Sequence, residues 1–191
     1  MNDFTLFFTE GIRHITDFRG YDHILFVAAL CLPYLLQDWR KVLILVTAFT
    51  LGHSVTLGLS VFDKIIVPTK WIEFLIPVTI LVTALENLGV KQFEFRRSNL
   101  RYGSALVFGL IHGMGFSNYL RSMMGKDENI LSELFAFNLG LEVGQISIVL
   151  VVLLIGFLFV NLFKVPRREW LLFVSGGIFG LALLMAIERW P

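Results

Sequence analysis

Long apolar runs dominate the chain, and short charged or turn-forming clusters separate them. Because a helix needs about 20 mainly apolar residues to cross the hydrocarbon core of a bilayer, the runs predict six membrane-spanning helices. The predicted spans are 21–36, 42–62, 71–88, 102–119, 132–163 and 170–187. The fifth run is longer than a bilayer requires, which predicts a tilt or a start in the headgroup region. The pattern is typical of an all-α polytopic membrane bundle that forms one domain over 1–191.

The segment 1–20 has a different pattern, in which apolar and charged residues alternate with helical spacing. The apolar residues are Phe4, Phe8, Ile12, Ile15 and Phe18, and the charged residues that interrupt this pattern are Asp3, Glu10, Arg13 and Asp17. This pattern predicts an amphipathic helix that lies in the membrane interface, ahead of the bundle formed by 21–191. A disordered tail is the alternative interpretation.

Composition supports the membrane assignment and excludes other classes. Of the 191 residues, 56% are hydrophobic and only 16% are charged, whereas soluble domains carry about 25% charged residues. A soluble globular domain and a disordered chain are therefore both excluded. The net charge of +1 gives no basic excess, which argues against nucleic acid as a partner. The expected partner is the lipid bilayer.

The distribution of lysine and arginine predicts the orientation. These residues are slightly more frequent after the first, third and fifth predicted spans than on the opposite side, chiefly because of the cluster in 91–101. Since cytoplasmic loops are enriched in lysine and arginine, we expect a cell (inner) membrane protein with both termini on the outer side.

Ionisable residues inside the apolar runs carry the strongest indication of function. A charged group near the bilayer centre costs about 2.5–3.5 kcal/mol on insertion scales, so such groups face the bundle interior and find partners there. All four histidines of the chain lie in apolar runs or at their edges, together with acidic residues at a compatible depth. The candidate metal ligands are His14, Asp22, His23, His53, His112 and Glu142. Imidazole and carboxylate together favour a divalent transition-metal ion, nickel, cobalt or zinc.

Other polar residues share helical faces with these candidates. In the fifth span, Asn138, Glu142 and Gln145 are spaced so that all three lie on one face. The predicted supporting polar path consists of Ser54, Glu73, Glu86, Asn138 and Gln145. Two small-xxx-small patterns, 109–113 and 140–144, allow close approach of the helices that carry His112 and Glu142. A hydrogen-bonded or proton-carrying network without metal is the alternative interpretation of the same residues.

Five segments of the chain resemble the HupE/UreJ family of small membrane proteins, whose studied members are regarded as nickel or cobalt permeases. The segments that carry the resemblance are 11–15, 20–26, 47–54, 108–116 and 137–145. The resemblance extends over nearly the whole chain. It implies that His14, Asp22 and His23 matter for metal uptake.

The chain also departs from the family pattern. Seven residues separate His14 from Asp22, where the first family motif has five. The second family motif has two histidines and a glutamate close together, and this chain has only His112 there. It therefore resembles a second, divergent branch of the family. The assignment of His53, His112 and Glu142 comes from the physical argument above.

The first hypothesis for function is a permease for a divalent transition metal, with nickel first by resemblance. The residues assigned to capture at the outer mouth are Asp22 and His23, with His14 assisting. The residues assigned to a dehydrated midplane site are His53, His112 and Glu142, with Glu86 as a relay towards the inside. An inside-negative membrane potential drives the ion inward.

The alternative hypothesis is a membrane-embedded zinc hydrolase that acts on a lipid or an acyl amide. Three histidines and a carboxylate around zinc, with one position open to water, generate a hydroxide nucleophile. Ser54 or Glu142 would assist it. A third hypothesis is a structural or accessory subunit in which the polar network only specifies helix packing.

Overall fold

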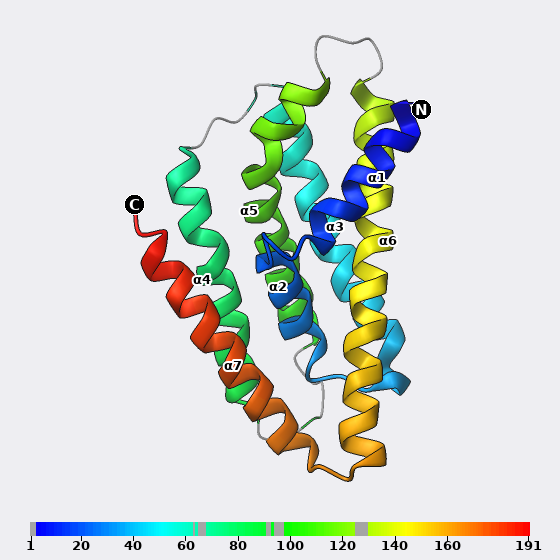
Figure 1. Ribbon diagram of the computed structural model, residues 1–191, viewed down its shortest axis with the longest axis vertical. Helices are drawn as coiled ribbons and strands as arrows, with labels where there is room; N and C mark the ends of the chain where they lie inside the picture. Colours follow the sequence, from blue (N-terminus) through cyan, green and yellow to red (C-terminus); the bar gives the residue numbers. More distant parts are fainter. Residues whose placement is uncertain (1–2, 63, 65–67, 91–92, 94–97, 125–129) are drawn as a thin grey trace.

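The computed structural model describes the chain except for 1–2, 63, 65–67, 91–92, 94–97 and 125–129. The described residues form helices and connections and contain no strand, which confirms the all-α bundle (Figure 1). The α-helices are α1 (Asp3–Thr16), α2 (Asp22–Cys31), α3 (Trp39–Val61), α4 (Thr69–Leu88), α5 (Ser98–Met124), α6 (Ile130–Phe157) and α7 (Arg167–Glu188). A 3-10 turn, η1 (Leu36–Asp38), precedes α3, and a π-helical turn, η2 (Leu158–Leu162), continues α6.

Four segments among the described residues are long and apolar enough to cross a membrane. They are Leu36–Val61, Thr69–Leu88, Ile130–Leu162 and Arg167–Glu188, and they match the second, third, fifth and sixth predicted spans. The helix α5, with 27 residues, covers the fourth. The membrane-protein assignment from the apolar pattern is thereby supported by helix length as well as by composition.

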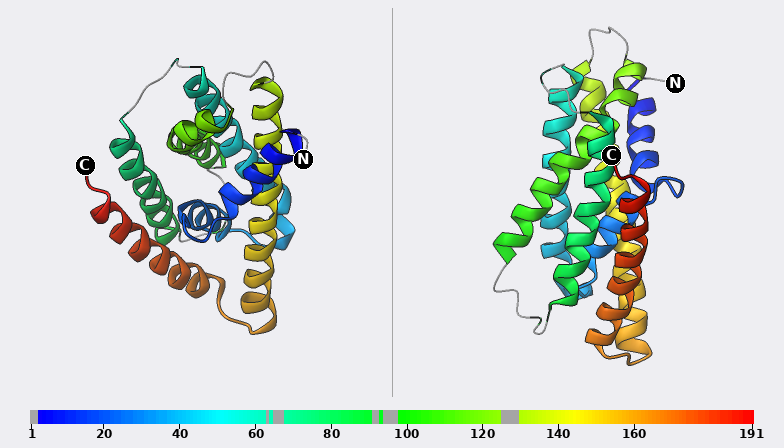
Figure 2. Two further views of the ribbon diagram at one scale, coloured as in Figure 1. Left: turned by 45° about the horizontal axis from the view of Figure 1, so that its top comes forward. Right: turned by 90° about the vertical axis from the view of Figure 1, so that its left-hand side faces the viewer.

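The predicted first span, 21–36, is wrong as a single spanning helix. Within it the structure has α2, a helix of ten residues that is about 15 Å long, half the thickness of the hydrocarbon core. The helix ends ahead of Pro33 because proline lacks a backbone N–H and disfavours helical geometry in the residue before it. The chain instead places α1 and α2 one after the other, so that α1 follows the upper half of α6 and α2 descends from about mid-height among the longer helices (Figures 1 and 2).

The predicted helix over the N-terminal segment forms as α1, and part of its surface is buried against protein. Phe7, Gly11 and Ile15 are buried. A Cβ atom on Gly11 or on Gly140 would lie nearer than 3.0 Å to backbone atoms of the opposite helix, so the backbones of α1 and α6 touch. The location of this segment in a membrane interface stays a prediction, and the structure adds that α6 holds the helix in place.

The helices α3 and α5 are in equally close contact. Gly52 of α3 and both Gly109 and Gly113 of α5 lie against the backbone of the opposite helix. This pairing of small residues is the one that allows two helix backbones to approach closely. Because His53 and His112 are carried by these two helices, the contact fixes how the middle of α3 faces the middle of α5.

Candidate metal centre

The four histidines of the chain converge from four different helices. His14 lies in the last turn of α1, His23 in the first turn of α2, His53 in the middle of α3 and His112 in the middle of α5. The ring centroids of His14 and His23 are 4.5 Å apart, those of His23 and His112 5.1 Å, and those of His14 and His53 5.9 Å. The break between α1 and α2 makes this possible, because it brings His23 level with the histidines on the long helices.

Three of the histidines have the spacing of a metal-binding group. His14, His23 and His53 each present one ring nitrogen, and these nitrogens all lie within 4.8 Å of one another. Two imidazole nitrogens on one tetrahedral zinc ion are about 3.4 Å apart. Side-chain movements of roughly 1 Å would therefore bring the three nitrogens into one coordination sphere. His112 is a neighbour of this group through its contact with His23.

Several ring nitrogens in the cluster have no hydrogen-bond partner among the described residues. They are His14 Nε2, His23 Nε2, His53 Nδ1, His53 Nε2 and His112 Nδ1, and all are buried atoms. Buried polar atoms in proteins are normally hydrogen-bonded, and each one left without a partner costs about 1–3 kcal/mol. A cation that accepts nitrogen lone pairs would satisfy several of these atoms at once.

Asp22 lies behind His23 and orients its ring. One carboxylate oxygen, Oδ1, accepts hydrogen bonds from the His23 backbone N–H at 2.9 Å and from His23 Nδ1 at 3.1 Å. The other oxygen, Oδ2, accepts a hydrogen bond from Arg189 at 3.0 Å. A histidine that donates through Nδ1 keeps the lone pair on Nε2 for a metal. The sequence predicts Asp22 as a metal ligand. The geometry supports a different role, in which Asp22 orients the ring of His23.

Replacement of Asp22 by asparagine is expected to lower the affinity for nickel or zinc by about 10- to 100-fold, the usual effect of losing an outer-shell carboxylate. The amide still offers an oxygen to His23, so we expect the fold to persist. Titration calorimetry on purified protein measures the change, with Asp3→Asn as the control because Asp3 is an exposed acidic residue outside the cavity. Equal losses of affinity in the two variants would contradict an orienting role for Asp22.

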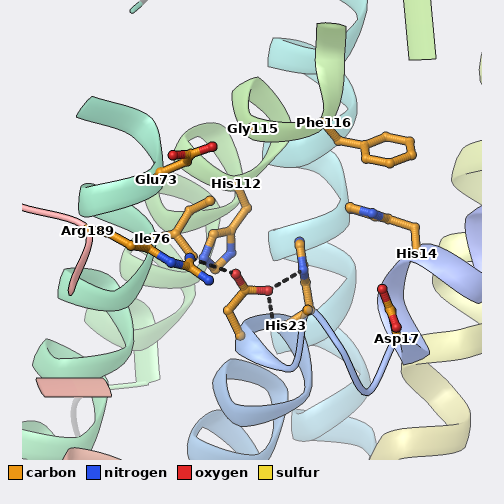
Figure 3. Close-up of a pocket in the computed structure, with 11 residues that line it drawn as sticks. His14, Asp17, His23, Glu73, Ile76, His112, Gly115, Phe116 and Arg189 are labelled. Carbon is orange, nitrogen blue, oxygen red and sulfur yellow. Dashed lines mark hydrogen bonds and ion pairs between the residues drawn. The ribbon is translucent and has the colours of Figure 1, made fainter. Parts of the chain in front are cut away.

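A cavity of about 370 Å³ connects three of the histidines to the surface (Figure 3). It is lined by His14, His23 and His112 and by the acidic residues Asp17 and Glu73. The two acidic residues are exposed, whereas His23 and His112 are buried. The cavity thus leads from exposed carboxylates to unpartnered nitrogens, and its wall also carries Asp22 and Arg189.

A buried polar stripe continues from His112 along α4. Nε2 of His112 lies 3.4 Å from Oγ1 of Thr79, and Thr83 and Asn87 follow on the same face. The Asn87 side chain donates a hydrogen bond to the carbonyl oxygen of residue 29 in α2, at 2.7 Å. Glu86, which the sequence analysis placed on this path, is half-buried beside the stripe.

Glu142 lies in a different polar contact. Its carboxylate accepts a hydrogen bond from Thr47 at 2.9 Å, and the two other polar residues of that face make the same kind of contact with α3. The hydrogen bonds between α3 and α6 are Thr47–Glu142, Thr50–Gln145 and Ser54–Asn138. The face predicted from the sequence exists, and in the structure it ties α6 to α3. Glu142 is outside the three-histidine group.

Arg189 is the residue at this centre that sequence analysis missed. It follows the last residue of α7 and lines the cavity. No periodic pattern connects it with Asp22, which is 167 positions away along the chain. The one signal available was that a carboxylate beside an apolar run needs a cationic partner.

A family model described as HupE / UreJ protein matches residues 1–189. No curated protein and no solved structure matches the chain.

Proposed function

The chain belongs to the HupE/UreJ family, and on this basis we propose that it carries a divalent transition-metal ion across the membrane by way of the four histidines. The observation that carries the proposal is the convergence of buried, unpartnered imidazole nitrogens at the end of a cavity. Imidazole suits nickel and zinc, and nickel is the first candidate because the sequence resembles nickel permeases.

The proposed route has three parts. The ion enters between Asp17 and Glu73, binds to the histidine cluster, and leaves along the stripe of Thr79, Thr83 and Asn87 on α4. A dication that moves inward down a potential of 100 mV gains about 4.6 kcal/mol, twice the value for a single charge. The potential alone would thus supply a driving force.

The arrangement of the ligands is compatible with release as well as binding. Transport requires a site that binds the ion firmly enough to admit it and weakly enough to let it leave. The three-histidine group is made of neutral ligands, and His112 lies beside it next to Thr79. We propose that the ion passes from the group to His112 by exchanging one nitrogen for another.

The orientation that we propose places the exposed carboxylates of Asp17 and Glu73 on the outer side of an inner membrane. The start of α1 and the ends of α3 and α5 lie at one end of the bundle, and the starts of α3, α5 and α7 lie at the other (Figure 1). The latter end carries Arg40, Lys41, Arg101, Arg167 and Arg168. The positive-inside rule assigns this end to the cytoplasm.

Reconstituted protein tests the proposal. Liposomes with an inside-negative potential of about 100 mV are expected to accumulate nickel when they contain the wild-type protein, and to lose this uptake when the potential is collapsed. His112→Gln, which removes the ring beside the stripe, is expected to bind metal and to transport it at a strongly reduced rate. Absence of potential-driven uptake of nickel, cobalt and zinc by the folded wild type would overturn the proposal. Stoichiometric zinc that survives purification, together with hydrolysis of an acyl-amide lipid, would replace it with the hydrolase.

A further inference from the structure

The cavity contains a permanent positive charge that the proposed route does not use. Arg189 reaches into the cavity from the end of α7, and its Nη1 donates a hydrogen bond to Asp22 Oδ2 at 3.0 Å (Figure 3). The Asp22 side chain is 11% exposed and that of Arg189 is 32% exposed. Since arginine stays protonated under all ordinary conditions, this charge is present whenever the cavity is.

The contact with Arg189 completes the set of partners around Asp22. Oδ1 is taken by the backbone N–H and Nδ1 of His23, and Oδ2 is taken by Arg189. Both oxygens of the carboxylate therefore have partners, and the charge of the carboxylate is balanced by the guanidinium. Without Arg189, Oδ2 would lose its partner, and a rotation of the Asp22 side chain would turn an anionic oxygen into the cavity that His23 and His112 also line.

That oxygen would change which ions the centre accepts. Oxygen ligands and negative charge suit magnesium, calcium and manganese, whereas a shell made only of imidazole suits nickel, copper and zinc. Manganese is the most sensitive probe because it is the hard ion that also accepts imidazole. The selectivity of the site thus depends on whether Asp22 stays behind His23 or joins the coordination shell.

We propose that Arg189 is a specificity-determining residue, which holds Asp22 away from the metal and so keeps the coordination shell all-nitrogen. This inference rests on the proposed function, because it assigns selectivity to the same histidine centre. Arg189 acts through Asp22 and does not touch the ion. The neighbouring Trp190 packs its ring edge-to-face on Phe74 of α4 with centroids 5.0 Å apart, a separate contact that anchors the end of α7.

The test compares the dissociation constants for nickel and manganese, measured by titration calorimetry on full-length protein in detergent. Arg189→Gln is expected to lower the ratio of manganese to nickel dissociation constants at least tenfold, mainly through tighter binding of manganese. Arg189→Lys is expected to lower it less, about threefold, because the ammonium keeps the charge but lacks the planar fork of the guanidinium. The double variant Asp22→Asn/Arg189→Gln is expected to return to the wild-type ratio, since no anionic oxygen is then left to bind manganese.

Trp190→Ala is the matched control, because it removes the neighbouring anchor of α7 without altering the charge at Asp22. It is expected to lower thermal stability and to keep the wild-type ratio. Equal loss of both affinities in Arg189→Gln, or an unchanged ratio, would show that the ion pair only docks α7 on α2 and would overturn the inference. If Arg189→Gln does not fold, Arg189→Lys takes its place, and an unchanged ratio of manganese to nickel dissociation constants in that variant would overturn the inference. A wild-type protein that binds neither metal would remove the proposed function and this inference together.

Discussion

Replacement of His53 by leucine is expected to stabilise the metal-free protein and to abolish its binding of nickel or zinc. Both ring nitrogens of His53 are buried without a hydrogen-bond partner among the described residues, and the side chain is 0% exposed. Removal of such groups relieves a cost of about 1–3 kcal/mol, and leucine has a volume close to that of histidine. The free energy of unfolding without metal should therefore rise, by an amount of that order. A residue kept for stability alone would show the opposite change.

The measurement is chemical unfolding in detergent, with and without nickel. A ligand at 100 times its dissociation constant adds about 2.7 kcal/mol to the stability of a protein that binds it. We expect the wild type to show an increase of this size and His53→Leu to show none. The signs of the two effects are opposite, so a general loss of structure cannot produce both.

Leu57→Ala is the control for this experiment. Leu57 lies one turn further along α3 and is also 0% exposed. Its truncation leaves a cavity and should cost about 2–5 kcal/mol, while the increase in stability on adding nickel persists. Retention of that increase in His53→Leu, or its loss in Leu57→Ala, would contradict a ligand role for His53 and favour a histidine that serves packing.

The helical bundle was predictable because the cost of exposing polar backbone in lipid leaves few solutions for a chain this apolar. The break between α1 and α2 was harder to predict. Apolar residues continue through Pro33 to Leu36, so hydropathy extends the span, whereas the helix ends at Cys31 for a backbone reason. This short break is important for the metal centre, because it brings His23 to the level of His53.

The grouping of the histidines follows from the same cost, since ionisable side chains in apolar helices turn inward. Periodicity predicts which face of a helix is polar, and it does not predict which neighbour that face meets. For this reason the sequence predicts Glu142 as a metal ligand, while the structure pairs its carboxylate with the hydroxyl of Thr47. The role of Arg189 could not be predicted because its partner, Asp22, is distant in sequence. The composition of a buried site is thus easier to infer than the pairing within it.

Replacement of Gly109 by alanine is expected to damage the fold and the metal site together. A Cβ atom at this position would lie nearer than 3.0 Å to the carbonyl oxygen of Phe49 and within 3.0 Å of the backbone nitrogen of His53. These are backbone atoms, so the clash is relieved only if α3 and α5 move apart. We expect a loss of about 1–3 kcal/mol in the free energy of unfolding, the usual cost of overpacking. Affinity for nickel should fall with it, because the movement shifts His53 relative to His23 and His14.

Gly176→Ala shows whether this effect belongs to the contact or to the substitution. Gly176 is on α7, and a Cβ atom there would have nothing within 4 Å. Alanine at such a helical position stabilises by about 0.5–1 kcal/mol relative to glycine, so this variant should be as stable as the wild type or slightly more, and should bind nickel normally. If Gly109→Ala kept its affinity for nickel while losing stability, the close contact of α3 and α5 would serve packing alone. If Gly109→Ala loses both stability and nickel affinity, and Gly176→Ala loses neither, the geometry of the histidines depends on the close approach of the α3 and α5 backbones.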